Sequence, residues 1–580
     1  MGRELNIVRL AQHRMRQYEP LVANYQSSDR SLDNEQRKAL EHILSSRDFV
    51  TLFRGGAGTG KSFTLREIKE GLNRAGHVVQ VLAPQRQQVV DLERDGFSGA
   101  QTVSALLKQN FLTRGTIVIV DEAGQIGGQQ MLELLSLIQT VRGRVILSGD
   151  THQHEAVEAS DALRAIEQYS GLGYAELTNI RRQNPGSAKT WAERQWLEQY
   201  KLAVNEAQQG KLGASFDRLD KQGAVVACTL ADQQQKLTEH FLEHFKNQQS
   251  TVVVSQSWSE IHKVNEQVRL GLKTQKLIGE AETAVTALER QDLTDAQKRD
   301  KRFYQPEFIL VFNRPTAGFK SGSAGKLCGI TDKHLLIEAD HRIRPVPFKE
   351  LDKITVCQPK ELSLSSGDRL QLKANAQSQD GRRLANGELV TVKEIHADGR
   401  IALNDGRVLA KNYRQFVRGY AVTSYAAQGK TVDYVLFSDS AAKAATNEQQ
   451  WYVTISRGRK GVKIFTADKI QLRQNIAHSG HRTLALDMAG ESAAHQLAKI
   501  WGRDVAYVLN VQQAQRKFNE RQMETLRQYG AVEQPQDAKP AEFIKPTEQV
   551  TPTVQKSETT RRCIEISPPQ TNQKSKGMRV

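Results

Sequence analysis

An eight-residue segment of this 580-residue chain has the residue types needed to hold the phosphates of a nucleotide. Residues 55–62 read GGAGTGKS and satisfy the pattern GxxxxGK(S/T) between an apolar run and a helical pattern. Glycines let backbone N–H groups surround phosphate oxygens, while the lysine can contact the β- and γ-phosphates and the serine can ligate Mg²⁺. The sequence therefore predicts a site for ATP and Mg²⁺. It consists of Gly55, Gly56, Ala57, Gly58, Thr59, Gly60, Lys61 and Ser62.

Two adjacent carboxylates follow a second apolar run, TIVIVDEAG, downstream of this segment. At the end of a buried strand, Asp121 can hold Mg²⁺ through water, and Glu122 can act as general base toward the attacking water. A third apolar run leads into LSGDTHQHEAV, where Gln153 is placed to sense the γ-phosphate. His152 and His154 suggest a metal site as an alternative, but no third ligand is nearby in the sequence.

Composition limits the classes of protein that this chain can be. Lys and Arg number 81 against 65 Asp and Glu, a formal net charge of +16, which favours a polyanionic partner. Basic residues scattered over a soluble protein are the alternative. The 4 cysteines form no CxxC pair, which argues against a zinc ribbon or disulfide framework and fits a reducing compartment. No apolar run reaches about 18 residues, so we expect a cytoplasmic protein without membrane insertion.

Short apolar runs that alternate with amphipathic helices predict an α/β fold with parallel sheets covered on both faces. Between 306 and 415, short alternating segments punctuated by Gly, Asp and Asn predict a β-rich insertion, whereas 281–302 is charged and helical in character. The C-terminal residues, rich in Pro, Gln, Thr and Lys, predict a disordered tail. The expected divisions are an N-terminal helix and linker (1–30), a first α/β domain (31–185), a second α/β domain (186–305 and 416–500), the insertion (306–415), and a C-terminal helix and tail (501–580).

Seven motifs occur in the order GGAGTGKS, VLAPQRQQV, IVDEAG, LSGDTHQ, LTNIRRQ, GYAVTSYAAQGKTVD and WYVTISRGR. In this order the chain resembles the superfamily 1 helicases of the RecD-like branch, in particular the helicase part of MobF-type conjugative relaxases. The resemblance spans residues 30–480 and implies two RecA-like P-loop motor domains, with the β-rich insertion matching an SH3-like module in the second. It also implies ATP-dependent helicase or translocase activity on single-stranded DNA, 5′→3′, in conjugative plasmid transfer.

The same resemblance assigns roles to individual residues. Gln36 would contact the adenine base, Gly429 would lie at the nucleotide, and Arg182 and Arg457 would reach the γ-phosphate as arginine fingers. Guanidinium groups suit this role because they neutralise charge on the transferring phosphoryl group. A track of polar residues would bond the phosphates of a single strand without reading its bases. The track would consist of Pro84, Gln85, Thr102, Thr423, Ser424 and Gln428.

The chain departs from the relaxase pattern in two respects. Tyr425 stands where many relatives carry histidine, and neither a three-histidine metal cluster nor an active-site tyrosine precedes the P-loop. We therefore expect no strand-nicking activity, in either a free-standing helicase or the C-terminal portion of a longer relaxase. The implied partners are single-stranded and duplex DNA, with relaxosome and secretion-coupling proteins bound through the tail. The alternatives are a RecD-like repair or recombination helicase, a non-catalytic DNA-binding scaffold and an ATPase acting on RNA.

Overall fold

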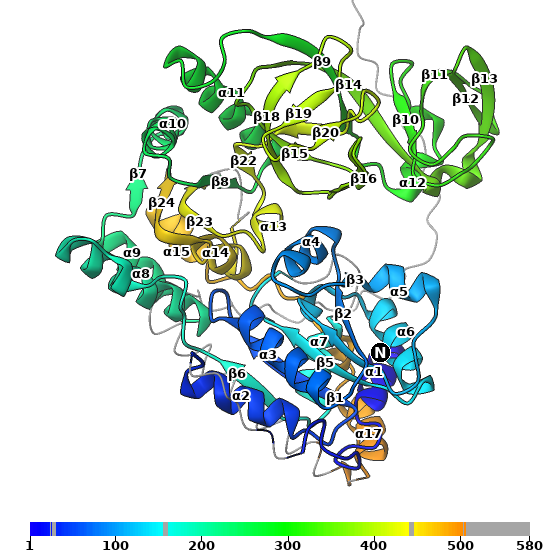
Figure 1. The fold of residues 1–580 in the computed structure, drawn as a ribbon, viewed down its shortest axis with the longest axis vertical. Helices are drawn as coiled ribbons and strands as arrows, with labels where there is room; N and C mark the ends of the chain where they lie inside the picture. The colour runs from blue at the N-terminus through cyan, green and yellow to red at the C-terminus, as the bar shows by residue number, and fades with distance from the viewer. Residues whose placement is uncertain are drawn as a thin grey trace, which may run out of the picture. The chain divides into compact units, whose positions relative to one another are not determined.

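The computed structural model describes residues 1–23, 25, 31–154, 161–439, 446–502, 504, 505 and 508 (Figure 1). It contains two parallel sheets and an antiparallel insertion between strands of the second sheet. The predicted fold class, α/β with two RecA-like motor domains and a β insertion in the second, is therefore confirmed. Within the described residues, no helix is long and apolar enough to cross a membrane. The expected tail lies almost entirely outside these residues, together with Cys563.

The first sheet has six parallel strands in the order β3-β2-β4-β5-β1-β6. These are β1 (Val50–Gly55), β2 (Val79–Ala83), β3 (Gln101–Thr102), β4 (Ile117–Val120), β5 (Arg144–Gly149) and β6 (Tyr174–Leu177). Alternate residues of a strand point to opposite faces, so each face has its own core. One face is covered by α1 (Gly2–Ala11), α5 (Val103–Gln109), α6 (Gly128–Thr140) and α7 (Ala162–Tyr169). The other is covered by α2 (Asn34–Leu44), α3 (Lys61–Arg74) and α4 (Arg86–Arg94).

The second sheet has five parallel strands in the order β22-β8-β23-β24-β7. These are β7 (Val225–Ala227), β8 (Thr251–Ser255), β22 (Ala421–Val422), β23 (Val432–Ser438) and β24 (Gly458–Thr466). On one face lie α8 (Trp191–Gln208), α9 (Leu212–Lys221), α13 (Ser424–Ala427), α14 (Glu448–Ile455) and α15 (Lys469–Asn475). On the other lie α10 (Leu230–Lys246) and α11 (Trp258–Thr274). Burial on both faces explains why the strands of both sheets are almost entirely apolar.

The insertion is larger than predicted and has two sheets and two main apolar cores, one of which combines residues of both sheets. The first contains β9 (Thr283–Arg290), β10 (Ile309–Phe312), β11 (Ala324–Ile330), β12 (His334–Ala339), β13 (Arg342–Pro347) and β14 (Ile354–Leu364). The second contains β15 (Arg369–Leu372), β18 (Leu389–Ile395), β19 (Ile401–Leu403), β20 (Val408–Leu409) and β21 (Phe416–Arg418). A short pair, β16 (Ala376–Gln377) and β17 (Arg383–Leu384), completes it.

One expectation about these boundaries was wrong. The segment 281–302, expected to be helical, holds strand β9, which pairs antiparallel with β14 along its whole length. Its helical part is limited to the short α12 (Asp295–Lys298) and the start of a 3-10 turn (Lys301–Phe303). The insertion therefore begins before residue 306. The sequence did not reveal β9, because the strand that pairs with it is distant in the sequence and leaves no local periodicity. The helix predicted within 1–30 is present as α1, and because Ile7 and Ala11 are buried in the core of the first domain, this helix packs as part of that domain.

The chain returns to the first domain after completing the second. Helices α16 (Ala485–Met488) and α17 (Gly490–Trp501) form an apolar cluster with α1 and α7. Leu5 and Val8 of α1 pack in this cluster with Leu497 of α17, and Glu4 accepts a hydrogen bond from the backbone N–H of Leu486 at 3.0 Å. The segment 485–500, predicted to belong to the second domain, therefore packs on the first (Figure 1).

Candidate functional site

The P-loop connects β1 to α3 and contains two glycines in left-handed conformations. Gly58 and Gly60 have φ values of 79° and 90°, which residues with side chains rarely adopt. Space is restricted as well, because a Cβ atom on Gly58 would lie 2.6 Å from Cβ of Arg182. A glycine turn that leads into a helix N-terminus can direct backbone N–H groups at phosphate oxygens. The local geometry therefore suits the nucleotide site predicted from the sequence.

Lys61, the first residue of α3, pairs with both predicted carboxylates. Its Nζ lies 3.1 Å from Oδ1 of Asp121 and 2.9 Å from Oε1 of Glu122. Burial disfavours the charged lysine, but the two carboxylates outweigh this effect and hold the pKa of Lys61 above its ordinary value. A charged ammonium is thus held at the end of the P-loop, where an incoming phosphate can replace the carboxylates.

The oxygen donors beside Lys61 suit a magnesium ion that arrives with a nucleotide. Asp121 is buried and accepts a hydrogen bond from Oγ of Ser148 at 3.3 Å, while Ser62 follows the lysine on α3. A hydroxyl and a carboxylate are hard donors, and Mg²⁺ commonly takes few protein ligands and completes its shell with phosphates and water. Within the described residues, no group of three His, Cys, Asp or Glu side chains could hold a metal alone. Glu122 has a φ of 54°, an uncommon conformation for a residue with a side chain and one that clusters at functional sites.

Asp150, directly after β5, connects the first motor domain to the second. Its Oδ2 accepts hydrogen bonds from Nε2 of Gln153 at 2.9 Å and from the hydroxyl of Tyr452 in α14 at 3.1 Å. The same hydroxyl accepts a hydrogen bond from the backbone N–H of Ala57 in the P-loop at 2.9 Å. Burial alone would raise the pKa of Asp150, but hydrogen bonds from His152 and Gln153 lower it to about 2. The carboxylate is therefore ionised and holds elements of both motor domains together.

Two guanidinium groups from distant parts of the chain, those of the half-buried Arg182 and the buried Arg457, meet beside the P-loop. Arg182 donates from Nη1 to the carbonyl oxygen of Ser456 at 2.6 Å, and Arg457 donates from Nη2 to Oε1 of Gln153 at 3.3 Å. Burial lowers the pKa of both, and the charge of Arg457 contributes to lowering the pKa of Arg182 to about 9. Neither arginine pairs with a carboxylate of the described residues. Their charge is offset only in part, by Glu122 near both and by Asp150 near Arg457, so both guanidinium groups are available to a phosphate.

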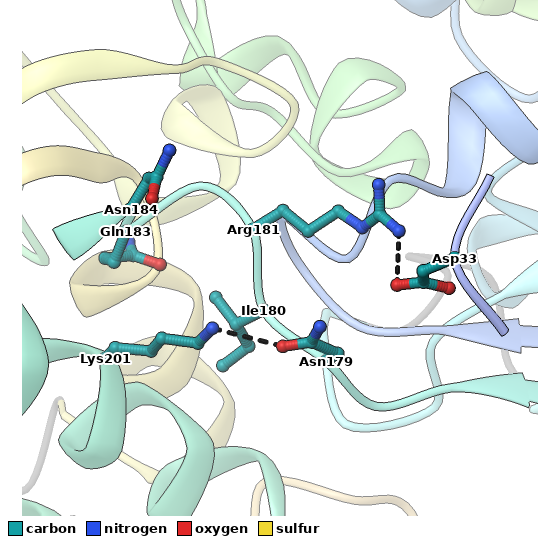
Figure 2. Close-up of a pocket in the computed structure, with 7 residues that line it drawn as sticks. All are labelled: Asp33, Asn179, Ile180, Arg181, Gln183, Asn184 and Lys201. Atoms are coloured by element: carbon teal, nitrogen blue, oxygen red, sulfur yellow. Dashed lines mark hydrogen bonds and ion pairs between the residues drawn. The ribbon is translucent and has the colours of Figure 1, made fainter. Parts of the chain in front are cut away.

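Gln36 lies against the P-loop with an unused hydrogen-bond donor. Its Oε1 accepts a hydrogen bond from Arg181 at 2.7 Å, whereas its buried Nε2 has no partner among the described residues. A Cβ atom on Gly60 would lie 2.8 Å from that Nε2. Beside them is a cavity of about 350 Å³, in which Arg181 and Asp33 point toward one another as an ion pair (Figure 2). The cavity and the free donor fit the base or ribose of a nucleotide.

The predicted track residues lie at strand ends, and those of the first sheet share one edge. Because Ala83 of β2 is paired with Thr102 of β3, Pro84 and Thr102 leave the sheet side by side. Gln85 precedes α4, and its Nε2 donates to Oε1 of Gln125 at 2.7 Å. Carboxyl ends of parallel strands are the usual ligand edge of an α/β sheet.

In the second sheet, Thr423 caps α13 and Oγ of Ser424 donates to Oε1 of Gln256 at 3.2 Å. Gln428 follows the same helix, and its Nε2 lies 3.4 Å from Oε1 of Gln153, so a residue predicted to lie on the track contacts the predicted γ-phosphate sensor. Gly429 comes next with a φ of 80°, and its place at the nucleotide stays a prediction.

Two aromatic residues of the motifs were given no role by sequence. The ring of Tyr425 stacks on His154 with centroids 3.8 Å apart, and Tyr452 binds Ala57 across 395 residues of chain. No local signal identifies such partners. His152 instead faces Asp150, with Nδ1 at 3.3 Å, so the two histidines are held by different partners rather than directed at one metal.

Known proteins show similarity to parts of this chain. A family model described as an AAA domain matches residues 31–230. The probable conjugal transfer protein TraA of Sinorhizobium fredii is 25% identical over 352 residues, covering 59% of this chain and 29% of that protein. The multifunctional conjugation protein TraI of Escherichia coli is 21% identical over 499 residues, covering 76% of this chain and 28% of that protein.

Among solved structures, Bacteroides Pif1 bound to single-stranded DNA covers 80% of this chain and 98% of its own, at 14% identity and a TM-score of 0.37. The chain spans less than a third of the length of the two curated relatives, 29% and 28%.

Proposed function

We propose that this chain, which carries an AAA domain and is related to conjugal transfer proteins, is an ATP-driven helicase or translocase on single-stranded DNA. The observation that carries the proposal is the meeting of the half-buried Arg182 and the buried Arg457 beside the P-loop, neither in an ion pair with a carboxylate among the described residues. Buried, unpaired charge is costly, and its retention favours a working hydrolytic centre over a non-catalytic scaffold.

Hydrolysis follows from the arrangement of the site. Lys61 would exchange its carboxylate partners for the β- and γ-phosphates of ATP. Glu122, released from the lysine, would accept a proton from the water that attacks the γ-phosphorus as the bond to the β–γ bridging oxygen breaks. Arg182 and Arg457 would neutralise the charge on the transferring group. Ser62 and Asp121 would hold Mg²⁺, which supplies further charge neutralisation when it is bound.

The same contacts suggest how hydrolysis is coupled to movement. Oε1 of Gln153 accepts hydrogen bonds from both Arg457 and Gln428. When Arg457 turns to a γ-phosphate, Oε1 of Gln153 loses one hydrogen-bond donor, and Gln428 is then free to shift. ATP binding and release would thereby open and close the two motor domains along the strand.

The net charge of +16 supports a nucleic-acid partner and predicts binding that weakens with salt. The names of the relatives support a role in conjugative transfer. Movement in the 5′→3′ direction, work in the cytoplasm, and contacts with relaxosome or secretion-coupling proteins are parts of the same proposal.

The direct test measures ATP hydrolysis by the full chain alone and with single-stranded DNA, duplex DNA or RNA. We expect single-stranded DNA to stimulate turnover, and Arg457→Ala to abolish turnover while ATP still binds. No stimulation by any nucleic acid would contradict the proposal, and equal stimulation by RNA would favour the RNA-acting alternative.

A further inference from the structure

An exposed tryptophan lies under a lysine where the second motor domain meets the insertion. Trp258, the first residue of α11, is 41% exposed although it is a large aromatic residue. Nζ of Lys373, just after β15, lies 4.3 Å from the centroid of the indole. The pair therefore joins two parts of the fold and leaves aromatic surface open to solvent.

The position of Trp258 relative to the track is fixed by strand pairing. β22 runs parallel to β8, with Val422 opposite Val254, so residues after both strands leave the sheet at one edge. Gln256, two residues before the tryptophan, accepts a hydrogen bond from Ser424 at 3.2 Å. The tryptophan thus follows by two residues a side chain that contacts Ser424, which the sequence placed on the single-strand track.

Unused hydrogen-bonding and charge capacity accompanies the ring. The Nε2 of Gln256 is buried and has no partner among the described residues. Lys373 forms no ion pair within the described part of the chain, and it lies close enough to Lys430 for its charge to lower the pKa of that residue. Burial is the main cause of that lowering, to about 8, and Arg369 adds to it. The edge therefore combines an amide donor with several cations, whose charge is partly offset by carboxylates: Glu289 and Asp292 near Lys373, and Asp91 and Glu388 near Lys430.

We propose that Trp258 is a stacking platform for one base of a single-stranded nucleic acid, with Lys373 and Gln256 directed at the adjoining phosphates. Base stacking on an aromatic ring needs no sequence recognition, and cations beside the ring suit the backbone that connects successive bases. The inference rests on the proposed function and extends it by naming the residue that holds a base. The rival explanation is that the cation–π pair only joins the motor domain to the insertion.

The chain offers a matched control. Trp191 is also the first residue of a helix, α8, after a capping hydroxyl residue, and it is 77% exposed. No cation is stacked on it among the described residues, and it does not follow a strand of the track edge. A change at Trp191 therefore reports the effect of losing an exposed indole without losing the platform.

The experiment measures the Kd of the full chain for a labelled oligothymidylate by fluorescence anisotropy. We expect Trp258→Ala to raise Kd about tenfold, Trp258→Phe to keep most of the affinity, and Trp191→Ala to have no effect. On a strand with abasic sites, wild type and Trp258→Ala should bind equally. Lys373→Gln should reduce the slope of log affinity against log salt by about 0.7.

Equal affinity of Trp258→Ala and wild type for the normal strand would overturn the proposal. So would an equal loss on the abasic strand, particularly if the melting temperature falls, because the pair would then be structural. If wild type bound no single strand at all, the proposed function itself would fail. If wild type bound the strand and hydrolysed ATP faster with it, but Trp258→Ala did the same, only the stacking proposal would be refuted.

Discussion

The hydroxyl oxygen of Tyr452 accepts a hydrogen bond from the backbone N–H of Ala57 at 2.9 Å, and this contact joins helix α14 of the second motor domain to the P-loop of the first. The same hydroxyl donates to Asp150 at 3.1 Å. One side chain therefore connects the loop that should hold phosphate, the strand end that carries Gln153, and the helix that precedes Arg457. A movement that separates the two domains must therefore break the contacts of Tyr452 with Ala57 or Asp150.

Replacing Tyr452 with phenylalanine should uncouple these elements. The buried Asp150 would lose a donor and the Ala57 amide an acceptor, at a cost of about 1–3 kcal/mol in the free energy of unfolding. We expect DNA-stimulated turnover to fall about tenfold with the fold intact. Tyr434→Phe is the control, because the Tyr434 hydroxyl has no hydrogen-bond partner among the described residues. Unchanged turnover and melting temperature in Tyr452→Phe would show that the contact has no function.

The two sides of the Lys61 ion pair should separate binding from chemistry. Lys61→Ala removes the cation that meets the phosphates, so hydrolysis should be abolished and ATP affinity reduced. Glu122→Gln keeps the shape of the side chain but cannot accept a proton, so this variant should bind ATP without turning it over. A fluorescent ATP analogue and a phosphate-release assay measure the two properties. Retained turnover in either variant would refute the assignment of the hydrolytic centre.

Neighbouring arginines should give different kinetic effects. Arg182→Ala is expected to lower kcat by about 10³ or more, as for other arginine fingers, with a melting temperature that does not fall, since a buried unpaired charge is removed. Arg181 pairs with Asp33 and contacts Gln36, so Arg181→Ala should mainly raise KM for ATP. Steady-state kinetics on both variants distinguish these roles. A kcat loss in Arg181→Ala as large as that in Arg182→Ala would contradict the separation.

The stacked pair of His154 and Tyr425 should make the fold sensitive to acid. Burial, together with the charge of Arg457, lowers the pKa of His154 from 6.5 to about 3. Above pH 6.5 the imidazole is neutral in both states. Below it the unfolded chain binds a proton that the folded chain does not, so stability decreases as the pH falls toward 3.

At about pH 5 this loss amounts to about 2 kcal/mol. His154→Phe keeps a ring against Tyr425 but cannot titrate, so its unfolding free energy should decrease less between about pH 7.5 and about pH 5. Chemical denaturation at both pH values measures the difference, with the exposed His42→Phe as the control. An equal decrease in His154→Phe and wild type would show that this histidine does not cause the acid sensitivity.

Local sequence was sufficient for the parts of the fold that have a local cause. Apolar runs bounded by turns predicted β1, β4 and β5 and the α/β class, because a strand buried on both faces must be apolar. The glycines of the P-loop and the carboxylates after β4 were identified in the same way. The structure then brings Lys61 within ion-pair distance of both Asp121 and Glu122.

Features that depend on distant partners could not be predicted in this way. Strand β9 exists because β14 pairs with it, and its own residues read as a charged helix. The packing of α1 against α17 joins the two ends of the described chain and has no local signature. Tyr452 and Tyr425 lie inside recognised motifs, yet their partners Ala57 and His154 become evident only in three dimensions.

Strand displacement tests the central claim most directly. The full chain is mixed with ATP, Mg²⁺ and duplexes that carry a single-stranded tail at either the 5′ or the 3′ end, with Lys61→Ala as the control. We predict that wild type displaces the strand of the 5′-tailed duplex and that Lys61→Ala displaces neither. Displacement from the 3′ tail would reverse the proposed polarity. Failure to displace either strand, or displacement by Lys61→Ala equal to wild type, would contradict an ATP-driven helicase.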